Sequence, residues 1–410
     1  MRFYMDTARL GQACPASMQV QCEFAGLAAY DPSFCSIGFL KDGASDWPSS
    51  LRSEFPTLSE WQGLAHLKRL FAAAVGVEDS QRVFLANQTA RLVRIAARAM
   101  ARQCHRVMTT DLNWPAWQSI VADEAARHGR EIKQIAISDS VMQHGWTAND
   151  IVNHLATTYC ENRCDGLFLP AVSSLGITVP VAQLVASLRR QSEVRFVLVD
   201  AAQAFGQVSL ESITASCDVL VTGCHKWLGA HLPMGVAVAG NSLAAKQFRC
   251  VVSGRDASLL CSDPLLMLTE QLQADEVNRY AETVSIVPML AANAALSSGQ
   301  ADPVITEQEF AQRLNNLDEA AACLSDSSWC PVSLNQTTRS AIMLATANHA
   351  SVRQAAPDTL QTHFRNHGIA LSAYQGGLLR LSMPSGILQQ NYLEFLSSAF
   401  QTVSHECRSM

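Results

Sequence analysis

The sequence predicts an α/β protein with a mostly parallel seven-stranded sheet in a large domain, followed by a smaller α+β domain at the C-terminus. Between residues 82 and 240, short β-branched runs alternate with longer segments of helical apolar spacing, as in βαβ units. After residue 285, long amphipathic stretches precede strand-like runs. The 410-residue chain is 48% hydrophobic, which is enough apolar material for a sizeable core.

The first 75 residues are irregular, with Gly, Pro, Trp and Ser clusters around 43–50 and an amphipathic segment at Leu58–Ala74. We expect them to form an arm and a leading helix at the rim of the small domain and active site. The seven strands expected in the large domain, residues 76–284, are Arg82–Ala86, His105–Thr109, Ile132–Ile137, Gly166–Pro170, Arg195–Asp200, Asp218–Gly223 and Gly235–Gly240.

Helical spacing between these strands is clearest at Thr89–Arg102 and Val181–Gln191. The small domain is expected to span 285–410. Its expected elements are helices at Val287–Ser298 and Glu307–Leu324, strands at Ser340–Thr346 and Gly377–Met383, and a last helix near Gln390–Val403.

Composition limits the class of partner. The net charge of -6, with no long run of either sign, gives no footprint for nucleic acid or a membrane surface, so a small molecule is the expected partner. No segment has the apolar pattern of a signal peptide or the roughly 18 apolar residues of a membrane span, and we expect a cytoplasmic protein. The 13 cysteines are scattered, which favours reduced thiols. Cys160 and Cys164 have no second pair at ligand spacing, so no metal site is expected.

Two apolar strands end in polar residues that together suggest a cofactor site. Asp200 ends one strand, and His225 and Lys226 follow another. Both strands are expected to deliver these groups to the carboxyl edge of the sheet, where ligands collect in α/β proteins. Pyridoxal 5'-phosphate (PLP) needs an amine for a Schiff base and a carboxylate for its pyridine nitrogen. Taken singly, a residue such as Asp200 is more often a turn residue at a strand end, and one such as Lys226 a solvated loop lysine.

The pattern Asp-x-x-Gln, an apolar strand, then Thr-Gly-x-His-Lys-Trp resembles the cofactor signature of the class V aminotransferase family of fold type I PLP enzymes. That family includes cysteine desulfurases, kynureninases and isopenicillin N epimerase-like proteins. The resemblance implies a homodimer and PLP held as an internal aldimine by Lys226. The residues it places around the cofactor are Asp200, Gln203, Thr222 and His225, with Gln203 a candidate donor to the phenolate oxygen.

Further segments resemble the family's cofactor contacts. Phe84–Thr89 looks like the strand and helix start that bind the phosphate, through Gln88, Thr89 and backbone N–H groups. The alternative there is an ordinary helix cap. Trp114 is placed where the family stacks a ring on the pyridine, with Trp117 as a competitor.

Ser173 lies in a segment similar to the loop that reaches the cofactor from a neighbouring strand end, where cysteine desulfurases usually carry Asn. Arg380 resembles the arginine that binds the substrate carboxylate, a task suited to a guanidinium fork. The alternative is a surface arginine on an edge strand. Ser253-Gly254-Arg255-Asp256 resembles a loop that reaches the partner subunit's cofactor phosphate, although it could be an ordinary turn.

We expect a class V aminotransferase-like enzyme that acts on a small amino acid, with Lys226 as the base at Cα. Residues 331–406 contain no cysteine, which disfavours the persulfide mechanism of cysteine desulfurases. Trp114, where those enzymes carry a histidine, points the same way. The alternatives are a lyase of the C–S or β-elimination type, an epimerase, or a catalytically silent protein of the same fold.

Overall fold

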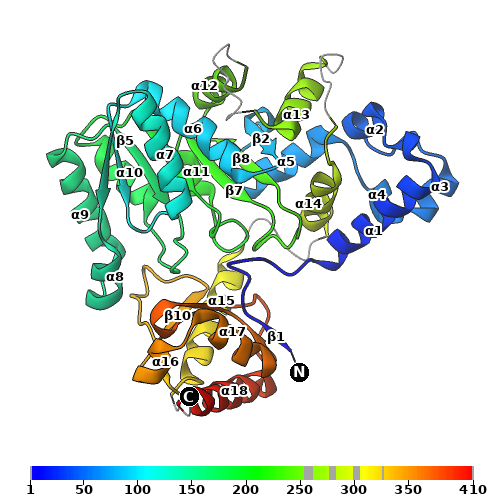
Figure 1. The fold of residues 1–410 in the computed structure, drawn as a ribbon. Helices are drawn as coiled ribbons and strands as arrows, with labels where there is room; N and C mark the ends of the chain where they lie inside the picture. Colours follow the sequence, from blue (N-terminus) through cyan, green and yellow to red (C-terminus); the bar gives the residue numbers. More distant parts are fainter. Residues whose placement is uncertain (1, 254–261, 277–282, 299–304, 326, 409–410) are drawn as a thin grey trace.

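The computed structural model describes residues 2–253, 262–276, 283–298, 305–325 and 327–408. Figure 1 shows a large body, built around a seven-stranded sheet, above a small body that contains α15 to α18. The N-terminal segment runs between the two bodies. The predicted contact segment Ser253–Asp256 falls outside the described residues except for Ser253.

The seven-stranded sheet has the order β2-β8-β7-β6-β5-β3-β4, and all its strands run parallel except β8, which is antiparallel to both neighbours. All seven predicted strands are present, with ends within two residues of those expected, which confirms the fold class. Their bounds are β2 (Val83–Ala86), β3 (Arg106–Thr110), β4 (Glu131–Ile135), β5 (Gly166–Pro170), β6 (Phe196–Asp200), β7 (Val219–Gly223) and β8 (Gly235–Ala239).

Both faces of this sheet are covered, which explains the continuous apolar runs in its strands. Alternate residues enter two separate cores. Phe196 and Leu198 belong to the core that includes side chains of α6 and α12, whereas Val197 and Val199 belong to the core on the opposite face. The edge strand β4 is mostly exposed and carries Lys133, a charge that discourages pairing with another chain.

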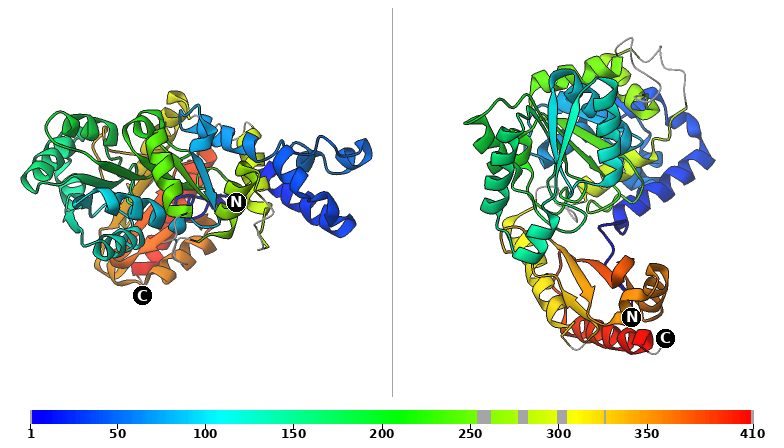
Figure 2. Two further views of the ribbon diagram at one scale, coloured as in Figure 1. Left: turned by 90° about the horizontal axis from the view of Figure 1, so that it is seen from above. Right: turned by 60° about the vertical axis from the view of Figure 1, so that its left-hand side comes forward.

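Helices lie on both faces of the large sheet, and α1 to α4 project to one side (Figure 2). The helices of the large body are α1 (Pro15–Tyr30), α2 (Ile37–Asp42), α3 (Ser49–Glu54), α4 (Pro56–Ser59), α5 (Leu64–Ala74), α6 (Thr89–Gln103), α7 (Pro115–Arg127), α8 (Ser138–His144), α9 (Ala148–Glu161), α10 (Val181–Arg189), α11 (Glu211–Ser216), α12 (Ser242–Ser253), α13 (Pro264–Ala274) and α14 (Val287–Ser297).

The small body is a four-stranded antiparallel sheet with helices, as the predicted α+β pattern requires. The sheet has the order β12-β13-β10-β9, and β1 pairs in parallel with β11 beside it. The bounds are β1 (Phe3–Tyr4), β9 (Trp329–Pro331), β10 (Ile342–Ala347), β11 (Ile369–Ala370), β12 (Ser372–Tyr374), β13 (Leu378–Ser382), α15 (Glu307–Ala322), α16 (Ala350–Gln354), α17 (Pro357–Asn366) and α18 (Gln390–Arg408).

The domain boundaries at residues 75 and 285 stay predictions. The first 75 residues contact both bodies: β1 pairs with β11, whereas α1 and α5 pack against α14. Helix α14, which the predicted boundary assigns to the small domain, therefore lies among helices of the large body. In the described ranges, no helix combines the length and the hydropathy that crossing a lipid bilayer requires.

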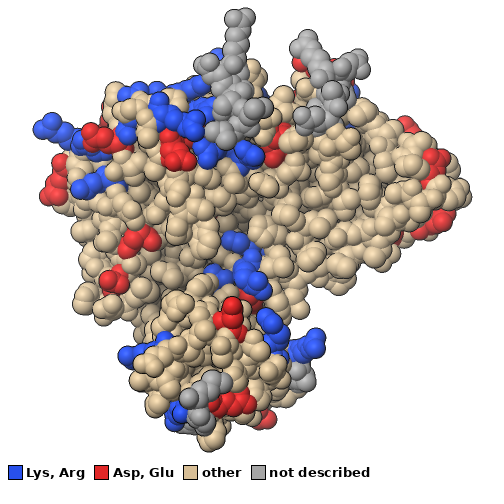
Figure 3. All heavy atoms as spheres, viewed as in Figure 1, with Lys and Arg blue, Asp and Glu red and all other residues tan. Residues whose placement is uncertain are grey.

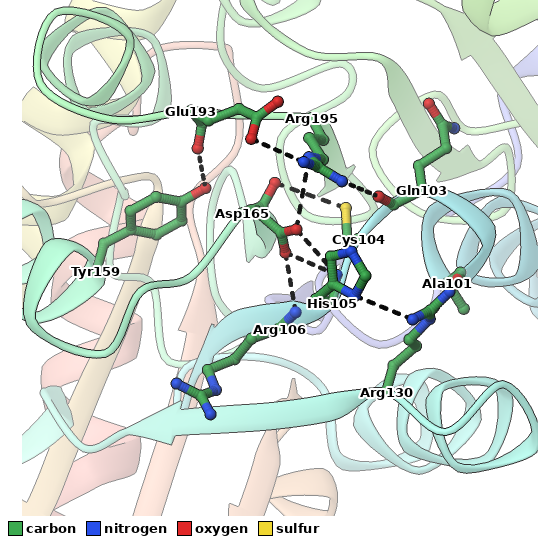
Figure 4. Close-up of polar contacts among 10 residues, drawn as sticks. All are labelled: Ala101, Gln103, Cys104, His105, Arg106, Arg130, Tyr159, Asp165, Glu193 and Arg195. Atoms are coloured by element: carbon green, nitrogen blue, oxygen red, sulfur yellow. Dashed lines mark hydrogen bonds and ion pairs between the residues drawn. The ribbon is translucent and has the colours of Figure 1, made fainter.

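A buried carboxylate joins the starts of three strands at the edge of the sheet opposite their carboxyl ends (Figure 4). Asp165, which precedes β5, accepts hydrogen bonds of 2.9 Å from the backbone N–H groups of His105 and Arg106 at the start of β3. Its own carbonyl accepts from the backbone of Arg195, before β6, at 2.8 Å. The Arg195 guanidinium adds an ion pair at 3.7 Å. Asp165 therefore aligns β3, β5 and β6.

Replacing Asp165 by alanine is expected to lower the free energy of unfolding by about 2–4 kcal/mol, because the N–H groups of His105 and Arg106 lose their acceptor. Urea denaturation would measure the change. Asp42→Ala, at an exposed acid on α2, is the matched control and should change stability by less than about 0.5 kcal/mol. Equal stability of the two variants would contradict the role assigned to Asp165.

Candidate active site

A cavity of about 610 Å³ lies where the carboxyl ends of β5, β6 and β7 face β12 and β13 of the small body. This is the edge of the sheet at which α/β proteins bind ligands. Nine of the ten residues predicted for the site line the cavity: Gln88, Thr89, Trp114, Ser173, Asp200, Gln203, His225, Lys226 and Arg380. Thr222 is the exception.

Asp200 and Lys226 line the same cavity, and the charge of each shifts the pKa of the other. Asp200, the last residue of β6, accepts a hydrogen bond from the backbone N–H of Ala202 at 2.9 Å. Burial raises the pKa of Asp200, opposed by that N–H, by the Lys226 charge and by the Trp117 side chain. Burial lowers the pKa of Lys226, as does Arg380, whereas Asp200 raises it. The lysine amine is therefore more easily deprotonated than an exposed one, which suits a nucleophile.

The turn that carries Lys226 is held by the N-terminal segment. The backbone N–H of Gly11 donates to the carbonyl of His225 at 2.8 Å. A Cβ at Gly11 would lie 1.8 Å from the carbonyl oxygen of Lys226, so only glycine lets the segment approach this closely. Gln203 joins the same assembly, since its Nε2 donates to the carbonyl of Ala8 at 2.7 Å.

The use of Gln203 limits what it can offer a ligand. Its Oε1 accepts from the indole N–H of Trp227 at 2.9 Å, and one of its two Nε2 hydrogens is committed to Ala8. One hydrogen is left for a group in the cavity. The predicted contact with a phenolate oxygen therefore depends on this single donor.

The start of α6 lines the cavity through Gln88, Thr89 and Ala90. The N-cap residue Gln88 makes no side-chain capping bond, whereas its carbonyl accepts from the backbone N–H of Arg91 at 3.1 Å. The Thr89 hydroxyl donates to the carbonyl of Thr222 at 3.1 Å. A Cβ at Gly235 in β8 would lie 2.6 Å from the Thr89 nitrogen, so this glycine allows the helix start to approach the sheet.

Two tryptophans compete for the stacking role. Trp114, the N-cap of α7, is 49% exposed and lines the cavity. Trp117, which also lines the cavity, lies one helical turn later and is only partly exposed. Its side chain acts on the pKa of Asp200. The choice between the two indoles stays a prediction.

The side chains of Ser173 and Thr222 form hydrogen bonds with nearby backbone groups. The Ser173 hydroxyl oxygen accepts from the N–H groups of Leu175 and Ile177 at 3.2 and 3.1 Å, and its hydrogen stays available to a ligand. Thr222 lies behind the wall of the cavity, where its hydroxyl donates to the carbonyl of Ala201 at 3.3 Å. It positions its neighbours but does not reach the cavity in this structure.

His225 offers an unused ring nitrogen beside Lys226. Its Nδ1 is buried and has no hydrogen-bond partner among the described residues. Burial lowers the pKa of His225, as does the neighbouring Lys226, which favours a neutral ring. A ligand in the cavity can supply the missing partner.

Arg380 lies in β13, between β12 and β10, so it is not a surface arginine on an edge strand. Its Nη2 donates to the Ser372 hydroxyl at 3.2 Å, and its Nη1 to the carbonyl of Ser174 at 3.5 Å. The guanidinium carbon lies 5.6 Å from the centre of the Tyr374 ring. These contacts fix the guanidinium in the wall of the cavity.

The sequence did not reveal the contribution of the N-terminal segment. Ala8 and Arg9 line the cavity, and Asp6 is buried beside Arg380 at 3.7 Å. The only sequence signal is the charged pair Asp6-x-x-Arg9 in an otherwise irregular arm. Tyr374 was missed as well, although it lies only six residues before Arg380.

Comparisons with known proteins identify the family of the chain. The family profile described as aminotransferase class-V matches residues 46–325, and the chain therefore belongs to this family. No curated protein shows significant sequence similarity to it.

Solved structures of similar fold include a desulfurase, a lyase and an aminotransferase. They include the cysteine desulfurase CsdA from Escherichia coli, with a TM-score of 0.72 and 15% identity over 98% of this chain and 94% of that one. The cystine C-S lyase C-DES has a TM-score of 0.68 and 15% identity over 98% and 97%. An alanine–glyoxylate aminotransferase from Nostoc sp. has a TM-score of 0.66 and 15% identity over 98% of this chain and 95% of that one.

Proposed function

We propose that this chain is a PLP-dependent enzyme that acts on a small amino acid. PLP is the cofactor of the class V aminotransferase family, to which the chain belongs. The observation that carries the proposal is that Lys226, Asp200 and Arg380 line one cavity. Because function is carried by a site and not by a fold, these three charged side chains in one cavity favour an enzyme over a catalytically silent protein.

The residues of the cavity suit this cofactor. The uncapped start of α6 suits a phosphate. The buried carboxyl of Asp200 suits a protonated pyridine nitrogen, and the unpartnered Nδ1 of His225 suits a ligand polar atom. Lys226 supplies the amine for covalent attachment.

When bound, PLP supplies an electron sink for a negative charge at the substrate Cα. The roles of the chain follow from the geometry of the cavity. Arg380 grips the substrate carboxylate, and the Lys226 amine moves the Cα proton. Asp200 would hold the protonated pyridine nitrogen through its negative charge. The helix start at Thr89 would hold the phosphate.

Transamination is the reaction that we propose first, with a C–S or β-elimination lyase or an epimerase as the alternative. No cysteine lines the described cavity, so a persulfide on the enzyme is disfavoured. Incubating the holoenzyme with a panel of amino acids and analysing the products tests the choice. Oxo acid with pyridoxamine phosphate supports transfer, whereas ammonia with a pyruvate-like product, or an inverted Cα, contradicts it.

Replacing Arg380 by glutamine is expected to raise KM for the amino acid roughly a hundredfold, because a charge-assisted bidentate contact is lost. The cofactor should stay bound, because Arg380 is not among the residues proposed to hold it. Arg380→Lys keeps the charge in the buried site and should lose less. Loss of the cofactor from Arg380→Gln, with Arg380→Lys unaffected, would show that Arg380 serves the cofactor instead.

We also propose a homodimer, which the family resemblance supports, and a cytoplasmic location. Light scattering of the purified protein tests the dimer.

A further inference from the structure

The N-terminal segment, residues 5–11, brings to the cavity two charged side chains that the proposed chemistry leaves unused. It is bonded to the small body through Met5 and to the turn before Lys226 through Gly11. Between these anchors, Asp6 is buried and Arg9 lines the cavity. Figure 3 shows Lys and Arg side chains at the junction between the two bodies, where Figure 1 places this segment.

The Asp6 carboxylate contacts both guanidinium groups of the cavity. Its Oδ2 lies 2.6 Å from the Nε of Arg9, and its Oδ1 lies 3.7 Å from an Nη of Arg380. The Ser372 hydroxyl also donates to Oδ1, at 2.5 Å. Two cations that share one carboxylate leave one positive charge unbalanced. Because this site is partly shielded from water, that charge attracts an anion that enters the cavity.

The two arginines lie at different depths. The Arg380 side chain is 5% exposed, whereas that of Arg9 is 64% exposed. Among the described residues, Arg9 is bonded through its Nε alone, which leaves the hydrogens of both Nη groups to a ligand. Tyr374, whose ring lies against Arg380, is 37% exposed and lines the same cavity. One cation is therefore deep in the cavity and the other at its mouth.

We propose that Arg9 binds a second acidic group of the substrate, so that the substrate is an amino acid with an acidic side chain. The inference rests on the proposed function, since Arg380 takes the α-carboxylate. The side chain of such a substrate extends from the buried arginine toward the mouth. Asp6 is a positioning residue: it holds Arg9 by the Nε and leaves the Nη groups directed to the ligand.

The test compares succinate with propionate, which are unreactive di- and monocarboxylates. Both are titrated into the holoenzyme, with tryptophan fluorescence as the readout because Trp114 and Trp117 line the cavity. The native enzyme is expected to bind succinate about five- to tenfold more tightly than propionate, a modest factor because Arg9 is solvent-exposed. Arg9→Gln should remove this preference.

Arg52→Gln is the matched control, because it removes the same charge from an exposed position on α3, and it should keep the preference for succinate. In kinetics, Arg9→Gln should raise KM for aspartate or glutamate by a larger factor than KM for alanine. Equal affinity of the native enzyme for the two carboxylates, or a preference that survives in Arg9→Gln, would overturn the inference.

The failure of this inference can be told apart from failure of the proposed function. If the protein does not bind PLP, the proposed function falls, and the same fluorescence titration without cofactor still tests Arg9. If PLP binds and reacts but succinate has no advantage, only the role of Arg9 falls.

Discussion

Lys226→Ala is expected to abolish covalent retention of PLP and to lower turnover by roughly 10²–10⁴-fold, the usual contribution of a positioned general base. The native enzyme should show a visible absorption band that borohydride reduction fixes to the chain. The variant should lose this band on dialysis, because the cofactor is then held by its non-covalent contacts only. Mass spectrometry after reduction would locate the label on the peptide that contains Lys226.

The control is Lys246→Ala, which removes a lysine from α12, outside the cavity, and should leave spectrum and turnover unchanged. Labelling of Lys226→Ala to the native extent would refute the assignment of the anchor. Such a result would mean that another amine takes the cofactor.

Asp200→Asn is expected to lower turnover roughly a hundredfold or more, since the cavity loses the charge that stabilises a protonated ring nitrogen. The same change should leave the cofactor-free protein at least as stable as the native one at neutral pH. Burial raises the pKa of Asp200, so the ionised carboxylate costs stability in the absence of cofactor.

The stability difference between Asp200→Asn and the native protein should depend on pH. The cost of burying the carboxylate is fully present above the folded-state pKa and disappears as the pH falls below the unfolded-state value. The advantage of Asn over Asp in the cofactor-free protein should therefore shrink in acid. Thermal unfolding at neutral and acidic pH measures this. A variant that is less stable at neutral pH but equally active would contradict the role assigned to Asp200.

The large sheet was predictable because its strands are buried on both faces. Val197 and Val199 face one core and Phe196 and Leu198 the other, so the strand is an unbroken apolar run that ends at Asp200. Because the carboxyl ends of parallel strands meet at one edge of a sheet, Lys226 and Asp200 could be predicted to lie at the same edge. The other predicted residues of the cavity, such as Trp114 and Arg380, came from the resemblance to the family and not from strand position.

The remaining parts depend on contacts that sequence patterns do not carry. The strands β9, β11 and β12 have two or three residues, too few for an alternation to register. Asp6 accepts a hydrogen bond from Ser372, 366 positions along the chain, and no sequence pattern near Asp6 predicts that partner. The signature also predicts a cofactor contact for Thr222, and its hydrogen bond to the carbonyl of Ala201 could not be read from that pattern.

The N-terminal segment has a mechanical consequence. Met5 is bonded to β11 and β13 and Gly11 to the turn of Lys226, and only five residues, which turn back on Asp6, link these two anchors. Such a short tether sets an upper limit on how far the substrate arginine can swing away from the lysine. Motion of the small body relative to the large body would therefore widen the mouth of the cavity while the distance between Arg380 and Lys226 changes little.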